Sequence, residues 1–144
     1  MATKTAPRPI ADTQRVAAVK DLLFRLGDDS LVLGHRDSEW TGLGPILEED
    51  IAFSSMAQDK IGHALALYTL LVELGEADPD TLAFSRGPDE FRCCSLAALP
   101  RGDWAFSLVR QFFFAEADAV RFSALSQWPP TASFRWRTDY VADD

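Results

Sequence analysis

The sequence predicts an all-α fold built around three long amphipathic helices, and three observations support this. Apolar side chains recur every three or four residues in three separate segments, which is the spacing of one helix face. No segment shows the strict alternation of polar and apolar residues that is typical of a half-buried strand. The 144 residues, 47% of them hydrophobic, suit one domain with a modest core.

The first two helices are predicted over residues 12–39 and 45–75. Pro45 is the expected first residue of the second helix, because proline is favoured at that position. Acidic residues follow in the opening turns, where the helix dipole favours negative charge. Gly75 is the expected C-terminal stop, since glycine readily adopts the backbone conformation that ends a helix.

The third helix is predicted over residues 103–127. The connection before it, residues 76–100, contains three prolines and is too long for a plain bundle loop. We therefore expect short helical pieces near 79–86 and 89–98. The third helix carries one apolar stripe: Trp104, Leu108, Phe112, Ala115, Ala119, Phe122 and Leu125.

The chain is predicted to divide into a flexible leader, one helical domain and an irregular tail, over residues 1–11, 12–127 and 128–144. The leader has two prolines and no hydrophobic stretch, unlike a secretory signal. The tail has adjacent prolines and no apolar periodicity, so the three helices lack the fourth element that would close a bundle. Such an abrupt change after Gln127 indicates a frame shift or a truncation.

The composition argues against several classes of protein. The net charge of -8 leaves no basic patch for a phosphate backbone, so we expect no nucleic-acid partner. No apolar run reaches the roughly 18 residues of a membrane-spanning helix. Cys93 and Cys94 are adjacent and fit no zinc or redox spacing, so we expect reduced thiols and a cytoplasmic location.

A lysine interrupts the apolar face of the second predicted helix. A charged group that faces other helices must be paired or must extend its amine to water. A lone histidine on such a face, as at His63, is more often a hydrogen-bonded core residue than a metal ligand. Lys60 lies one turn before His63, within a stripe of apolar residues: Phe53, Ala57, Ala64, Leu67, Leu71 and Leu74.

The aromatic residues favour two different roles. Trp40 and Trp104 lie at helical positions that are usually part of a core. Three consecutive phenylalanines, residues 112–114, cannot all face one core, so at least one ring must point away from it. An outward ring beside a bundle that lacks a helix suits a subunit interface.

Five blocks occur in one order along the chain: LGDDSLVLGHRDSEW (26–40), GPILEEDIA (44–52), QDKIGHALALY (58–68), EFRCC (90–94) and GDWAFSLVRQFFF (102–114). Together they resemble the phenylacetic acid catabolic proteins, and in particular the C-type subunits of the bacterial phenylacetyl-CoA epoxidases. The resemblance covers roughly residues 15–127. It implies a ferritin-like helical bundle, here incomplete, in a multicomponent monooxygenase that forms a ring epoxide with oxygen and electrons from a reductase. It also implies a catalytic partner subunit that carries a di-iron centre, which the C-type subunit supports.

The resemblance further implies a degenerate metal site. A carboxylate-bridged di-iron site takes a carboxylate from each of two helices and a Glu-x-x-His pair from each of two others. Lys60 stands where the catalytic subunit has the glutamate of one pair, with His63 as the histidine. A charged ammonium has no lone pair for iron, so we expect no metal, no cofactor and no catalytic residue in this chain.

The other two carboxylate positions are placed by the resemblance near Asp29 or Ser30, and near Glu116 or the gap at Ala115. We expect the ammonium of Lys60 to replace the metal as counter-charge for inward-facing carboxylates, with Glu116 and Asp29 as its partners. Such a pairing would avoid the cost of an unpaired buried charge.

Two other functions remain open. The chain could be an independent ferritin-like di-iron protein, which Lys60 and the missing fourth helix disfavour. It could also be a free-standing α-helical protein that self-associates to complete its bundle. Because an unfinished core exposes apolar surface, we expect either a homo-oligomer or a partner resembling the catalytic subunit.

Overall fold

The computed structural model describes residues 12–127, and these contain helices but no strand. This confirms the all-α prediction. The helices in chain order are α1 (Asp12–Ser38), α2 (Leu47–Glu73), α3 (Pro79–Phe84), the 3-10 turn η1 (Pro88–Glu90), α4 (Ser95–Ala98) and α5 (Trp104–Ser126). The predicted leader and tail lie outside the described residues.

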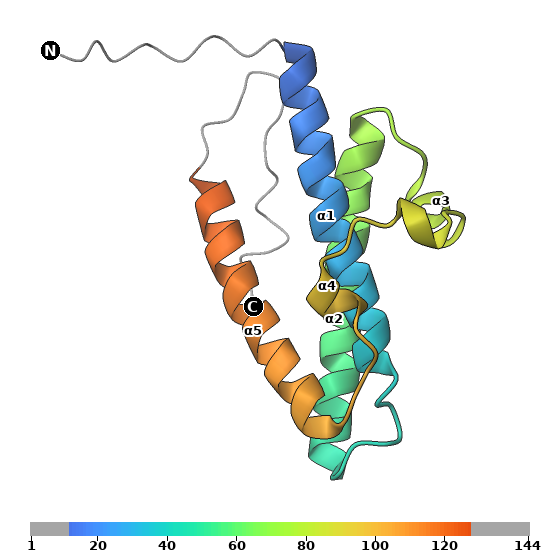
Figure 1. Ribbon diagram of the computed structural model, residues 1–144, viewed down its shortest axis with the longest axis vertical. Coiled ribbons are helices and arrows are strands. Elements are labelled where there is room, and N and C mark those ends of the chain that lie inside the picture. The colour runs from blue at the N-terminus through green and yellow to red at the C-terminus, as the bar shows by residue number, and fades with distance from the viewer. Residues whose placement is uncertain (1–11, 128–144) are drawn as a thin grey trace, which may run out of the picture.

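α1 is the central helix of the fold (Figure 1). α2 packs antiparallel along it, α4 lies against another of its sides, and α5 reaches it through long side chains. The middle of α1 is therefore buried on almost every side. The main apolar core lies between α1, α2 and α3, and its buried members are Leu23, Phe24, Leu26, Leu31, Ala64, Leu67, Tyr68, Leu71 and Leu82.

Two glycines of α1 allow α2 to approach closely. A Cβ atom at Gly27 would lie 2.6 Å from Cε1 of Tyr68, and one at Gly34 would lie 3.1 Å from the carbonyl oxygen of Ala57. Larger side chains at these positions would force the helices apart. Gly27 and Gly34 are thus contact positions between the two helices.

The start of α2 differs from the prediction. The helix begins at Leu47, and Pro45 precedes the extended residue that caps it. The chain before this cap folds back onto the first turn, where the backbone N–H of Gly42 donates to the Asp50 carboxylate at 2.8 Å. The helix therefore begins two residues after Pro45, and its first turn is tied to the preceding loop by this hydrogen bond.

The end of α2 follows the prediction closely. Gly75 has a φ of 90°, a conformation that favours glycine. Its N–H donates to the carbonyl of Val72 at 2.9 Å, and the N–H of Glu76 donates to the carbonyl of Leu71 at 3.0 Å. These two bonds form a Schellman motif, which satisfies carbonyls that the helix end would leave unpaired.

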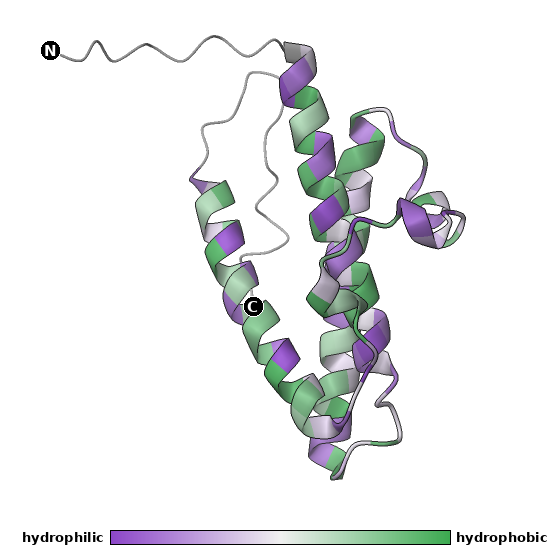
Figure 2. Ribbon diagram, viewed as in Figure 1, coloured by the Kyte–Doolittle hydropathy of each residue, from purple (hydrophilic) through white to green (hydrophobic). Residues whose placement is uncertain are grey.

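The buried face of α5 is more polar than predicted. The apolar stripe is wrong as a buried face, because Leu108 is 50% exposed and Phe112 is 59% exposed. The helix instead buries Ser107, Arg110, Gln111 and Phe114. Apolar residues also cover much of the rest of α5, as Figure 2 shows, so hydropathy alone did not identify the inner face.

The aromatic residues divide as the sequence predicted. Trp40 and Trp104 pack edge to face, with ring centroids 5.0 Å apart, and the indole N–H of Trp40 donates to Oγ of Ser107 at 2.9 Å. In the phenylalanine run, Phe114 is buried, whereas the rings of Phe112 and Phe113 are both 59% exposed. The outer face of α5 is therefore aromatic.

The connection between α2 and α5 is helical in shorter pieces than expected. The first piece ends at Phe84, and the second is divided into η1 and α4. Asp78 caps α3, since its carboxylate accepts the N–H of Thr81 at 3.0 Å. This connection places Arg86 and the backbone N–H of Cys94 against α1.

Candidate functional site

Lys60 lies on the buried face of α2 and is paired with a carboxylate. The residue is 7% exposed, and its ammonium lies 2.6 Å from Oδ2 of Asp118 on α5. The predicted apolar stripe surrounds it, and the residues of that stripe from Phe53 to Leu71 are buried. A positive charge therefore occupies the space between α2 and α5.

The pair continues into a network that joins three helices. Arg121, one turn after Asp118 on α5, hydrogen-bonds to the other carboxylate oxygen of Asp118 and lies 3.1 Å from Oδ2 of Asp29 on α1. The remaining oxygen of Asp29 accepts the backbone N–H of Cys94 at 2.7 Å. Burial alone would lower the pKa of Arg121, but the carboxylates of Asp118 and Asp29 outweigh it and raise that pKa.

The predicted partners of Lys60 need correction. Glu116 is exposed, and Asp118 takes the place expected for it. Asp118 continues the buried face of α5 one turn beyond Phe114, whereas Glu116 lies on the opposite side. Asp29 does belong to the cluster, but it reaches Lys60 only through Arg121 and Asp118.

The other predicted positions lie as follows. Ser30 is buried next to Asp29, and Ala115 is exposed. His63 is half-buried on α2, one turn after Lys60. The cluster thus brings together Asp29 and Lys60 of the predicted set, and it leaves Glu116 outside.

The donor set of this cluster does not suit a metal ion. Each of its two carboxylates already has a cationic partner, Lys60 or Arg121, at ion-pair distance. A second cation would meet repulsion from both, since like charges in a partly buried site are destabilising. Between residues 12 and 127, no group of three His, Cys, Asp or Glu side chains has the geometry of a metal site.

The sequence pattern did not predict a second buried cluster, which is centred on Asp28. Asp28 is fully buried, accepts the hydroxyl of Tyr68 at 2.6 Å and lies 2.5 Å from Nη2 of Arg86. The backbone N–H of Arg92 donates to its other oxygen at 2.7 Å. Burial and the Asp28 carboxylate together raise the pKa of Tyr68. Two adjacent aspartates within a buried helix were a signal that could have pointed to this cluster.

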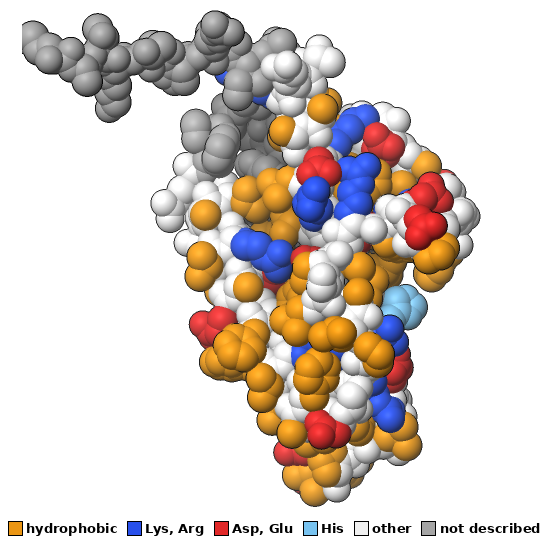
Figure 3. All heavy atoms as spheres, viewed as in Figure 1, with side chains coloured by type: hydrophobic (Ala, Val, Ile, Leu, Met, Phe, Trp, Pro, Cys, Tyr) orange, Lys and Arg blue, Asp and Glu red, His pale blue; other side chains and the backbone are white. Residues whose placement is uncertain are grey.

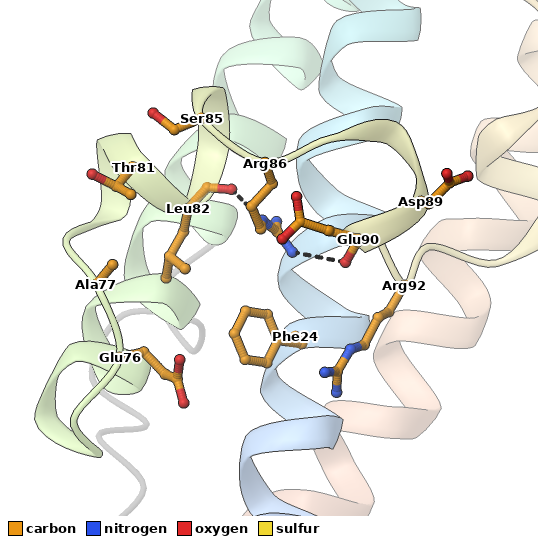
Figure 4. Close-up of a pocket in the computed structure, with 10 residues that line it drawn as sticks. All are labelled: Phe24, Glu76, Ala77, Thr81, Leu82, Ser85, Arg86, Asp89, Glu90 and Arg92. Atoms are coloured by element: carbon orange, nitrogen blue, oxygen red, sulfur yellow. Dashed lines mark hydrogen bonds between the residues drawn. The ribbon is translucent and has the colours of Figure 1, made fainter.

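Arg86 also lines the pocket shown in Figure 4. The pocket has a volume of about 490 Å³ and lies between α1, α3 and η1, with the ring of Phe24 on one side. The guanidinium of Arg86 lies 4.1 Å from the centre of the Phe91 ring and is anchored by Asp28. Because Arg86 and Arg92 both have carboxylate partners, the pocket presents no unpaired cation.

Two other expectations concern the chain as a whole. Cys93 and Cys94 are both free thiols in the structure. No helix of the described part of the chain is both long enough and apolar enough to cross a bilayer.

Comparison with known proteins identifies two similarities. The family model described as "Phenylacetic acid catabolic protein" matches residues 1–133. The C-type subunit of the 1,2-phenylacetyl-CoA epoxidase from Escherichia coli (strain K12) is 38% identical over 105 residues. That alignment covers 72% of this chain and 42% of the relative, so the chain spans less than half of the relative's length.

Proposed function

The chain belongs to the phenylacetic acid catabolic protein family, and from this premise we propose that it is a non-catalytic structural subunit of a phenylacetyl-CoA epoxidase complex. In this role it supports a separate catalytic subunit that carries the di-iron centre, in the aerobic degradation of phenylacetate. The identity to a C-type epoxidase subunit carries the proposal. The chain itself provides no catalytic residue and no cofactor.

The interior of the helical domain supports a structural role. Lys60, Asp118 and Arg121 fill the space between α2 and α5 with fixed, mutually paired charges. An ion-pair network of this kind joins helices and offers no open coordination position. It therefore stabilises the fold where a catalytic relative would bind metal.

The outer face of α5 supports a protein partner. Five large apolar side chains on this helix are at least half exposed: Leu108, Val109, Phe112, Phe113 and Val120. Figure 3 shows apolar side chains gathered over α5 and the neighbouring part of the molecule. Exposed apolar patches of this kind mark interaction surfaces, and aromatic residues are enriched in interface cores. We propose that this face is covered by the catalytic subunit.

Co-expression with the tagged catalytic subunit of the same complex tests this function. The wild-type chain should be retained with the tagged subunit on an affinity resin. Val120→Asp places a charge on the 70% exposed residue of the α5 face and should reduce recovery at least tenfold. Gln58→Asp, at an exposed polar position of α2, is the matched control and should be retained like wild type. Equal retention of both variants would rule out α5 as the contact.

Iron content separates this function from the alternative, an independent di-iron protein. The purified chain should contain far less than one iron per chain. Lys60→Glu creates a Glu-x-x-His sequence with His63, but it should still fail to bind two irons because the remaining ligands are missing. Stoichiometric iron in the wild-type chain would support the alternative instead. For location we propose the cytoplasm, where free thiols such as Cys93 and Cys94 remain reduced.

A further inference from the structure

α2 carries an exposed apolar stripe of its own. Its members recur at helical spacing, so they lie on one face of the helix. They are between 38% and 70% exposed: Leu47, Ile51, Ile61, Leu65 and Val72. The stripe extends for about 38 Å, at a rise of 1.5 Å per residue. Apolar residues aligned over such a length differ from the single exposed ones that any protein surface has.

This stripe points away from α5. Lys60 pairs with Asp118 of α5 and lies five residues before Leu65. The side chains of Lys60 and Leu65 therefore point about 140° apart around α2. On the other side the stripe borders α1, because Cδ1 of Ile61 would lie 3.0 Å from a Cβ atom added at Gly34. A partner on the outer face of α5 would leave the α2 stripe uncovered.

The fully exposed charged side chains of α2 are all acidic. Glu48, Asp59 and Glu73 are separated by about three and about four helical turns, so they form one row. The row lies about a quarter turn around the helix from the apolar stripe. The helix dipole favours Glu48 in the first turn, but it disfavours Glu73 at the last residue of the helix. Asp59 and Glu73 form no ion pair with any residue between 12 and 127, so pairing within the fold does not account for them.

We propose that this face of α2 binds an amphipathic helix of another protein, whose apolar side is flanked by lysine or arginine residues. The apolar stripe supplies anchor positions at the spacing that helix recognition uses. The acidic row beside it attracts the basic flank and fixes the orientation of the bound helix. The proposal does not depend on the epoxidase role, because it concerns a face that the proposed α5 contact leaves free.

A second copy of this chain fits the α2 face less well than a basic helix does. In an antiparallel pair of α2 helices the two acidic rows would lie next to each other. Like charges placed side by side across an interface oppose association. Each copy also carries a net charge of -8. Charge complementarity therefore favours a different protein as the occupant.

Two synthetic helical peptides of about 25 residues, the length of the stripe, test the chemistry of the partner. Both carry the same leucine face, which is flanked by lysines in one peptide and by glutamates in the other. Fluorescence anisotropy with the full chain should show that the lysine peptide binds at least tenfold more tightly. Its binding should weaken as the ionic strength rises, because salt screens exposed charges. Equal affinities, or no binding of the lysine peptide, would overturn the proposal.

Variants of the chain test where the lysine peptide binds. Leu65→Asn should weaken binding at least fivefold, whereas Val120→Asn, the same kind of change on the outer face of α5, should not. The double variant Asp59→Lys, Glu73→Lys should instead prefer the glutamate peptide. All four positions are exposed, and circular dichroism checks that each variant keeps its helix content. An equal loss with Val120→Asn would place the peptide on α5 and refute the α2 site.

Light scattering tests the remaining occupant, a second copy of the chain. Leu65→Asn should leave the oligomeric state of the chain unchanged. A shift of this variant towards monomer would show that the α2 stripe binds another copy, and would contradict the proposal of a basic helix.

Discussion

Lys60 differs from an isolated buried lysine because its carboxylate partner has a second cation. Asp118 contacts both Lys60 and Arg121, so each of the two positive charges neutralises it in part. Removing one cation therefore does not leave a fully unpaired buried carboxylate. Replacing Lys60 should therefore lower the free energy of unfolding by more than the loss of an exposed ion pair does, and by less than the loss of a lone buried ion pair does.

Lys60→Met should lower the free energy of unfolding by about 1–3 kcal/mol, because a charge-assisted hydrogen bond is lost while Arg121 still pairs Asp118. Urea unfolding measures this change. Lys20→Met is the matched control, since Lys20 pairs with Glu76 at 2.7 Å but both side chains are partly exposed. The control should lose less than about 1 kcal/mol. Equal losses in both variants would contradict the importance of the Lys60 network.

Asp37 should make the stability of the chain depend on pH. Its pKa is about 6 in the folded protein, because burial disfavours the charged form, against 3.8 as the ordinary value. The folded state therefore binds the proton more tightly than the unfolded state. Its contribution to stability is fully present below about pH 4 and is lost as the pH rises through about 6, by at most about 3 kcal/mol.

Asp37→Asn should remove this dependence. The variant should show a flatter stability profile between pH 4 and 7 and a higher free energy of unfolding at pH 7.5 than wild type. Urea unfolding over a series of buffers measures both quantities. Asp59→Asn, at an exposed position of α2, should retain the wild-type profile. A wild-type slope in the Asp37 variant would show that another group titrates in this range.

At the scale of single helices, the contact between α1 and α2 depends on the absence of a side chain at Gly27. Gly27→Ala places a methyl group 2.6 Å from the buried ring of Tyr68. This overpacking should lower the free energy of unfolding by about 1–3 kcal/mol. Gly62→Ala provides the control, because no atom lies within 4 Å of its added Cβ. That change should be neutral or stabilising by up to about 1 kcal/mol, since alanine favours helix. Thermal unfolding compares the two variants.

Apolar periodicity predicted α2 correctly because the buried face of that helix is apolar apart from Lys60. It failed for α5 because Ser107, Arg110 and Gln111 are buried by contacts with other segments, which hydropathy does not register. For the same reason, the sequence did not predict that Asp118 pairs with Lys60. The sequence placed α5 correctly to within a residue or so at each end, but the face it turns towards α2 depends on how the helices pack.

At the scale of the whole molecule, α5 lies apart from the α1–α2 pair over much of its length (Figure 1). Its inner side is attached through charged and polar side chains, such as Arg121 with Asp29. Its outer side exposes Phe112 and Phe113, whose ring centroids are 5.8 Å apart. Both features suit a helix whose apolar face is completed by another protein surface.

The isolated chain should therefore self-associate at micromolar concentration when no partner is present. Burying two half-exposed phenylalanine rings per chain removes substantial apolar area from water, which favours association. Size-exclusion chromatography with light scattering should show species larger than a monomer for wild type. The double variant Phe112→Ser, Phe113→Ser should shift towards monomer, while Gln58→Ser, a change at an exposed polar position of α2, should not. A stable wild-type monomer at these concentrations would show that the exposed apolar face of α5 does not drive self-association.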